Sequence, residues 1–300
     1  MLRIDGIVPV IPTPFSEDEE IDWAAFGGLV EFACRSGACA FCLPAYASEF
    51  YKLSEEERRR LVVEAVRLAA GKIPVLAQVN YASAGQAART ARIFQQAGVS
   101  AIAAAVPRQF AVPESDLLRY FGRILSAIDI PLLIQDFNPG GATVSAGFVA
   151  ALHKAHPHFR WVKLEEAQMG PRVRAILDAT AGEVGVLEGW GGMYMLDLIP
   201  EGICGVMPGL ATADILARIY ALARAGEAAR AHEIFAAVLP QIVFSLQNLE
   251  LFHHAEKRLL AARGLLPRPV VRDLRMEPNE ADSRRIDFLN ARILELVRSL

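Results

Sequence analysis

Eight short apolar runs recur along the chain, and their spacing constrains the fold more than any other feature of the sequence. They begin roughly every 30 residues and are continuously apolar, which is typical of parallel strands covered on both faces. Segments with helical patterns separate them. Eight such units predict an α/β protein, a (β/α)8 TIM barrel over residues 1–225. The runs are residues 7–11, 39–43, 73–79, 101–106, 130–135, 159–168, 184–188 and 203–207.

The end of the chain has a different pattern. Beyond about Gly226 the apolar runs stop, and the remaining residues carry helical patterns interrupted at Pro240 and Gly264. A length of 300 residues fits a barrel of about 250 residues with an appendage. We therefore expect a C-terminal α-helical extension over residues 226–300, packed on the barrel. His253 and His254 are adjacent on its predicted second helix, so they face different directions and are expected at the surface rather than on one metal ion.

Composition narrows the classes of partner. A formal net charge of −3 gives no electrostatic case for nucleic acid or an anionic membrane, so a small molecule is the expected ligand. The N-terminus reaches prolines and charges too early for a signal peptide, and no apolar run approaches about 18 residues. We expect a cytoplasmic protein with four free cysteines. In Cys39-x-x-Cys42 a strand would point the two sulfurs to opposite faces, which argues against a metal or redox site.

The sixth run carries a lysine, Lys163, among apolar neighbours. On a strand, side chains alternate between faces, so Trp161, Lys163 and Glu165 share one face, and Val162 and Leu164 lie on the other. If the shared face points into the barrel, Lys163 loses contact with water. Loss of water favours the neutral amine, which is the nucleophilic form that attacks carbonyl carbons. The alternative is a lysine that pairs with an acidic neighbour or reaches solvent along its stem.

The remaining candidate residues follow from the rule that barrels place reacting groups at the carboxyl ends of their strands. No cluster of metal ligands is found in these stretches, so we expect covalent amine catalysis with no metal and no cofactor. Glycines 189, 191 and 192 around Trp190 leave open a phosphate site made of backbone amides. The candidates beside Lys163 are Tyr46, Ala47, Ser48, Gln135, Glu165, Gly189 and Met207.

Five stretches carry a resemblance to a known family. TPF at Thr13, SEFYKLSEEER from Ser48, PLLIQD from Pro131, VKLEE from Val162 and GICGVMPG from Gly202 resemble, in order and spacing, the dihydrodipicolinate synthase and N-acetylneuraminate lyase family. The resemblance spans essentially the whole chain. It implies a barrel with a helical extension, assembled as a homotetramer or dimer. It also implies that Lys163 forms an imine, or Schiff base, with pyruvate or another 2-oxo acid, and it adds Cys204 to the substrate-binding candidates.

The chain departs from the family pattern at four places. The strand-two loop, which holds the substrate carboxylate in the family through hydroxyls and amides, reads Ala45-Tyr46-Ala47-Ser48-Glu49 here. Gln135 stands where the family has a proton-relaying tyrosine, and a glutamine cannot titrate. Gly140 stands near the position of the arginine of true dihydrodipicolinate synthases. The stretch VPRQF from residue 106 lacks the tyrosine that a neighbouring subunit lends to the relay.

These departures leave three functional hypotheses. The first is a Schiff-base-forming lyase acting on a 2-oxo acid, either an aldolase or a 2-keto-3-deoxy sugar acid dehydratase, with Glu165 or Tyr46 as the replacement acid–base group. The second is a true 4-hydroxy-tetrahydrodipicolinate synthase with an altered proton relay. The third is a non-catalytic barrel that binds a metabolite. The alternative to a role in proton transfer is a salt bridge for Glu165 and a packing ring for Tyr46.

Overall fold

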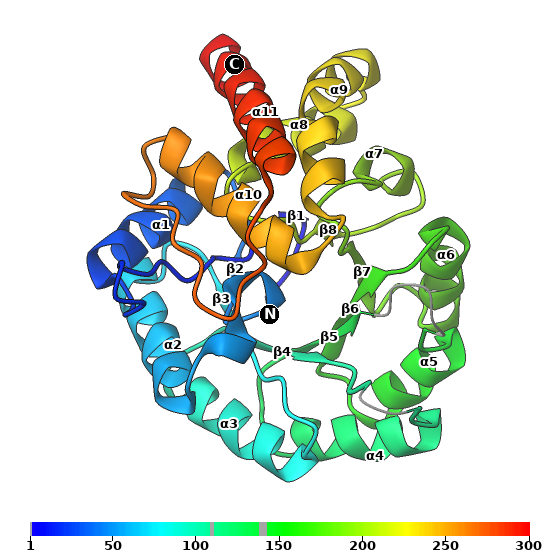
Figure 1. Ribbon diagram of the computed structural model, residues 1–300. Coiled ribbons are helices and arrows are strands. Elements are labelled where there is room, and N and C mark those ends of the chain that lie inside the picture. Colours follow the sequence, from blue (N-terminus) through cyan, green and yellow to red (C-terminus); the bar gives the residue numbers. More distant parts are fainter. Residues whose placement is uncertain (1, 109–110, 138–142) are drawn as a thin grey trace.

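The computed structural model of the protein describes residues 2–108, 111–137 and 143–300 (Figure 1). The described residues form eight parallel strands in the order β1-β8-β7-β6-β5-β4-β3-β2. Val10 bridges to both Cys42 and Gly209, which brings the two edges of the sheet together. The predicted (β/α)8 TIM barrel is therefore confirmed. The strands are β1 (Gly6–Ile7), β2 (Phe41–Leu43), β3 (Val75–Gln78), β4 (Ala101–Ala105), β5 (Leu132–Phe137), β6 (Phe159–Glu165), β7 (Gly185–Glu188) and β8 (Gly205–Val206).

Helices alternate with the strands and surround the barrel (Figure 1). Several begin at side chains whose capping role the sequence predicts: Asp22 accepts the amide of Ala25, and Ser54 and Glu57 form a capping box. Two short 3₁₀ turns, η1 (Tyr46–Ser48) and η2 (Phe50–Lys52), follow β2. The helices of the barrel are α1 (Trp23–Arg35), α2 (Glu55–Ala69), α3 (Ala84–Gln96), α4 (Glu114–Leu125), α5 (Ala146–Ala155), α6 (Met169–Ala179), α7 (Met195–Leu198) and α8 (Ala213–Arg224).

The strands are shorter than the apolar runs that predict them, most clearly at the start of the chain. β1 covers Gly6–Ile7, whereas the run extends over residues 7–11. Pro9 has no N–H to donate to a neighbouring strand, so the regular ladder stops before it. Beyond it the contact continues irregularly, because the amide of Cys42 donates to the carbonyl of Pro9 at 2.9 Å.

Strand β6 presents its two faces as the alternation predicts. Trp161 packs with the apolar side chains of the barrel interior, whereas Val162 and Leu164 pack in the layer between strands and helices. In the sheet, Lys163 lies beside Gln135 of β5 and Leu187 of β7. Lys163 and Glu165 therefore project into the barrel interior, which is the arrangement that removes a lysine from water.

The expected C-terminal extension contains α9 (Ala228–Ser245), α10 (Leu249–Ala262) and α11 (Glu280–Ser299). Helix α10 lies over the β1 and β2 side of the barrel (Figure 1). A buried ion pair links it there, because Lys257 donates to Glu49 in the loop after β2. The boundary between residues 225 and 226 stays a prediction. No helix among the described residues has the length and apolar character needed to cross a membrane.

The expected surface position of His253 and His254 is wrong. Their side chains are 1% and 8% exposed, because α10 packs on the loop after β2 and on α11 and so has contacts around most of its circumference. The Nε2 atom of His253 lies 3.0 Å from the hydroxyl of Tyr51 in η2. Among the described residues, no group of three or more His, Cys, Asp or Glu side chains is arranged so that it could hold a metal ion.

Candidate active site

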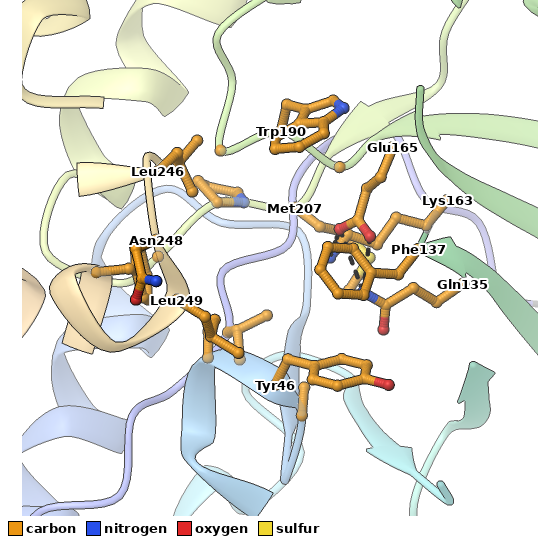
Figure 2. A pocket seen from close by; sticks show the side chains of 18 of the residues that line it. Tyr46, Gln135, Phe137, Lys163, Glu165, Trp190, Met207, Leu246, Asn248 and Leu249 are labelled. Atoms are coloured by element: carbon orange, nitrogen blue, oxygen red, sulfur yellow. Dashed lines mark hydrogen bonds and ion pairs between the residues drawn. The ribbon is translucent and has the colours of Figure 1, made fainter. Parts of the chain in front are cut away.

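A pocket of about 250 Å³ opens at the carboxyl ends of the strands (Figure 2). It is lined by barrel residues and, on the opposite side, by the segment 246–249 between α9 and α10. Its volume lies just below the usual range for ligand sites, roughly 300–1,000 Å³. The pocket is therefore suited to a small molecule. Among the predicted site residues it contains Tyr46, Ala47, Gln135, Lys163, Glu165, Gly189 and Met207.

Lys163 and Glu165 form an ion pair in this pocket. Their Nζ and Oε1 atoms are 2.8 Å apart, and the two residues are 6% and 5% exposed. Figure 2 shows both side chains directed toward one another and toward Gln135. The sequence left two alternatives for Lys163, a lysine that faces the barrel interior or one that pairs with an acidic neighbour. The structure shows both, because Lys163 lines the pocket and is paired with Glu165. A carboxylate at this distance can take a proton from the amine or return one.

Gln135 contacts the same carboxylate. Its Nε2 atom donates to both oxygens of Glu165, at 3.2 and 3.1 Å, while its Oε1 accepts from Nε2 of Gln78 at 2.5 Å. The residue at the family's tyrosine position is therefore a hydrogen-bond donor to Glu165 and not a titrating group. Gly140, which the sequence aligns with the family's arginine, lies outside the described residues.

Tyr46 belongs to η1 and forms a wall of the pocket. Its ring lies 5.1 Å from that of Phe137 and 5.0 Å from that of Phe50, measured between centroids. Burial, together with the negative charge of Glu165, raises the pKa of the Tyr46 phenol. The phenol therefore remains protonated at neutral pH, which leaves it able to donate a hydrogen bond but makes it a poor base.

The strand-two loop lines the pocket with Ala45, Tyr46 and Ala47, and not with the predicted serine Ser48. Ser48 Oγ donates to the carbonyl of Ile11 at 2.6 Å and accepts the amide of Ala45 at 3.0 Å. The side chain of Ser48 is buried behind the loop and does not line the pocket. It shapes the turn, so that the amides of Tyr46 and Ala47 lie at the start of η1, where a helical turn has no acceptor for them.

Cys204 lies at the opposite end of the barrel from Lys163. It immediately precedes β8 and lines a separate cavity with Trp161 and Ile4, at the amino ends of the strands. Three residues of extended chain separate it from Met207, or roughly 10 Å. The expected substrate-binding role of Cys204 does not fit this position. Cys204 and Met207 are close together in the GICGVMPG motif, but they lie at opposite ends of β8.

The comparison with known proteins agrees with this geometry. The model of the dihydrodipicolinate synthetase family matches residues 3–284. The chain belongs to this family. An L-2-keto-3-deoxyarabonate dehydratase of Azospirillum brasilense is 28% identical over 250 residues, which cover 80% of this chain and 79% of that protein. A 4-hydroxy-tetrahydrodipicolinate synthase of Methanopyrus kandleri is 23% identical over 293 residues, covering 96% and 97% of the two chains.

Solved structures extend the likeness to the fold. The 4-hydroxy-tetrahydrodipicolinate synthase of Methylacidiphilum fumariolicum superposes with a TM-score of 0.90 at 19% identity, covering 99% of this chain and 98% of that chain. The predicted dihydrodipicolinate synthase-like family is confirmed, and with it the prediction that the protein is a lyase.

Sequence reasoning missed several pocket residues of this family member. Phe137 is a wall of the pocket, and Leu249 and Phe252 reach it from the extension. The sequence does contain a signal for the start of α10, the helix of the extension that reaches the pocket, because Asn248 is a typical N-cap residue. Nothing in the sequence indicates that this helix start lies over the barrel mouth.

Glu188 supports the pocket from behind. It is fully buried on the outer side of β7, where it accepts the amide of Gly192 at 2.7 Å. Burial raises the pKa of Glu188 to about 7. Because a carboxylate lies behind the glycine loop and already takes one of its amides, the loop is poorly suited to the phosphate site that the sequence left open.

The raised pKa makes Glu188 a source of pH-dependent stability. The folded protein binds this proton more tightly than the unfolded chain, so the stabilisation is complete below about pH 4.5 and is lost as pH rises through about 7. Glu188→Gln cannot titrate, so it should lack this contribution to the pH dependence of stability. Across this pH range the contribution amounts to about 3 kcal/mol in the free energy of unfolding. Urea denaturation of both proteins between about pH 4.5 and 8 measures it. The exposed Glu233→Gln should behave as wild type, and identical pH dependence in Glu188→Gln would contradict the assignment.

Proposed function

We propose that the protein is a Schiff-base-forming lyase that acts on a 2-oxo acid through Lys163. The observation that carries this proposal is the ion pair between Lys163 Nζ and Glu165 Oε1 at 2.8 Å, buried at the base of the pocket. An amine in such a site attacks the C2 carbonyl of a 2-oxo acid, and its neighbour supplies and removes the protons. We assign the binding of the substrate carboxylate to the amides of Tyr46 and Ala47, because they begin η1 on the pocket wall, where a helical turn offers them no acceptor.

The reaction follows from the roles of these two side chains. Glu165 takes a proton from Lys163, and the neutral amine adds to C2. Return of that proton to the carbinolamine hydroxyl releases water and leaves a protonated imine. The imine nitrogen then accepts the electrons of a C3–H bond while Glu165 takes the C3 proton. Loss of a hydroxyl from C4, protonated as it leaves, completes a dehydration, and hydrolysis of the imine frees Lys163.

We favour the 2-keto-3-deoxy sugar acid dehydratase over the aldolase. Dehydration needs one carboxylate that removes a C3 proton and delivers it to a leaving hydroxyl at C4, and Glu165 beside Lys163 meets that need without the family's tyrosine. The dehydratase of Azospirillum brasilense, similar over 80% of this chain, supports the same substrate class. We expect a homotetramer or dimer, as the sequence resemblance implies. The N-terminus favours a cytoplasmic protein, and the amine chemistry of Lys163 needs no cofactor.

Replacement of Lys163 tests the imine. With pyruvate and borohydride, the wild-type protein should gain one reduced pyruvate adduct per chain, measured by intact mass spectrometry. Lys163→Ala should show none, because the side chain that forms the imine is absent. The exposed lysine on the α2–β3 turn offers a matched control, and Lys72→Ala should trap as well as wild type. Full trapping in Lys163→Ala would overturn the proposal.

Replacement of Glu165 tests the proton transfer. Glu165→Gln keeps size and hydrogen bonding but removes the titrating group, so imine trapping should persist. Exchange of the C3 hydrogens of pyruvate with D₂O, followed by NMR, should slow by about 10²-fold or more. Glu166→Gln is the control, since Glu166 faces Thr143 and Arg172 instead of the pocket. An unchanged exchange rate in Glu165→Gln would return Glu165 to a purely ionic role and direct attention to Tyr46.

The synthase hypothesis requires a proton relay in the active site. Condensation of pyruvate with aspartate semialdehyde uses the proton relay that Gln135 cannot supply. In a coupled assay we expect kcat/KM with aspartate semialdehyde far below about 10⁴ M⁻¹s⁻¹, the lower end of ordinary enzymes. A value in the ordinary range would make the protein a synthase with an altered relay. Pyruvate binding without any trapped imine would support the non-catalytic barrel.

A further inference from the structure

We propose that Gln78 is a positioning residue that sets the direction of the hydrogen bonds reaching Glu165. The inference rests on the proposed function, in which Glu165 transfers the proton. Gln78 ends β3, is 5% exposed, and does not line the pocket. It lies in a chain of amide groups that runs across the barrel from the backbone of β4 to the carboxylate beside Lys163.

The chain of amides starts at a backbone N–H group, which can only donate a hydrogen bond. The backbone amide of Ala105 donates to Oδ1 of Asn80 at 3.0 Å. A backbone N–H donates and never accepts, so the oxygen of Asn80 must face Ala105. The same Oδ1 atom lies 3.1 Å from Nε2 of Gln78. Since an oxygen of this kind accepts only, Gln78 must present its nitrogen.

The orientation of the Gln78 amide in turn fixes the orientation of the Gln135 amide. Its Nε2 atom has two hydrogens, and both have an acceptor: Oδ1 of Asn80 at 3.1 Å and Oε1 of Gln135 at 2.5 Å. Gln135 therefore has its oxygen directed to Gln78 and its nitrogen directed to Glu165. A reversed Gln135 would place nitrogen against nitrogen on one side and oxygen against carboxylate on the other.

The end of the chain is the catalytic carboxylate. Both oxygens of Glu165 accept from Nε2 of Gln135, at 3.2 and 3.1 Å, in addition to the contact with Lys163. Hydrogen bonds donated to a carboxylate stabilise its charged form. Gln78 thus fixes which groups donate hydrogen bonds to Glu165, although it touches neither Glu165 nor the pocket.

Other titratable groups also face Glu165 and are common to every variant. Lys163 lies on the same strand, the phenol of Tyr46 lies across the pocket, and Glu188 interacts through its charge from β7. The thiol of Cys42 on β2 lies 4.0 Å from Oε1 of Gln78 and is kept protonated by burial, which raises its pKa to about 12. Their effects cancel when pH profiles of wild type and a Gln78 variant are compared.

The test is the pH dependence of C3 deuterium exchange on pyruvate. Gln78→Met keeps the length of the side chain and cannot donate, so Gln135 loses its fixed direction. The midpoint of the acidic limb of the exchange profile should move up by about one pH unit, while borohydride trapping persists. Gln96→Met, an exposed amide on α3, is the matched control and should leave the midpoint unchanged.

A second variant keeps the inference testable if Gln78→Met does not fold. A carboxyl carries at most one hydrogen, so Gln78→Glu cannot donate to both Asn80 and Gln135 and should move the midpoint in the same direction. A midpoint equal to that of wild type in a folded Gln78 variant would overturn the inference. Absence of both trapping and exchange in wild type would instead contradict the proposed function.

Discussion

The ion pair between Lys163 and Glu165 is the interaction on which the rest of the site depends. Two charges inside an apolar barrel are costly unless they are close and hydrogen-bonded. The distance of 2.8 Å between Nζ and Oε1 meets the first condition, and the amide of Gln135 meets the second. Above them lies the pocket, and in the proposed function a substrate that enters would exchange one of these contacts for a covalent bond to the amine.

Buried carboxylates also fix the loops around this pair. Asp136, Glu188 and Glu256 each accept a backbone amide at 2.7 Å, from Val144, Gly192 and Ala211 respectively. All three lie behind the pocket wall, on β5, β7 and α10. Each such bond satisfies a buried backbone donor, which would be costly to leave without a partner. The active-site rim is thus held by acids that take no part in the chemistry.

Much of the fold was predictable because it depends on local patterns. Eight apolar runs require eight covered strands, and the alternation on the sixth run directs Lys163 and Glu165 into the barrel. The errors concern residues whose neighbours in space are distant in sequence. Ser48 was expected to bind substrate, yet its hydroxyl bonds to Ile11, 37 residues away. His253 was expected at the surface, yet it is buried against Tyr51.

The sequence by itself determined the barrel, the family, and the identity and facing of the buried lysine, since strand alternation and motif order are properties of neighbouring residues. Only the tertiary structure decided which groups surround that lysine. The path from Ala105 through Gln78 and Gln135 to Glu165 joins four strands. Hydrogen bonds across strands depend on register and closure of the sheet, and a pattern along one strand carries no information about either.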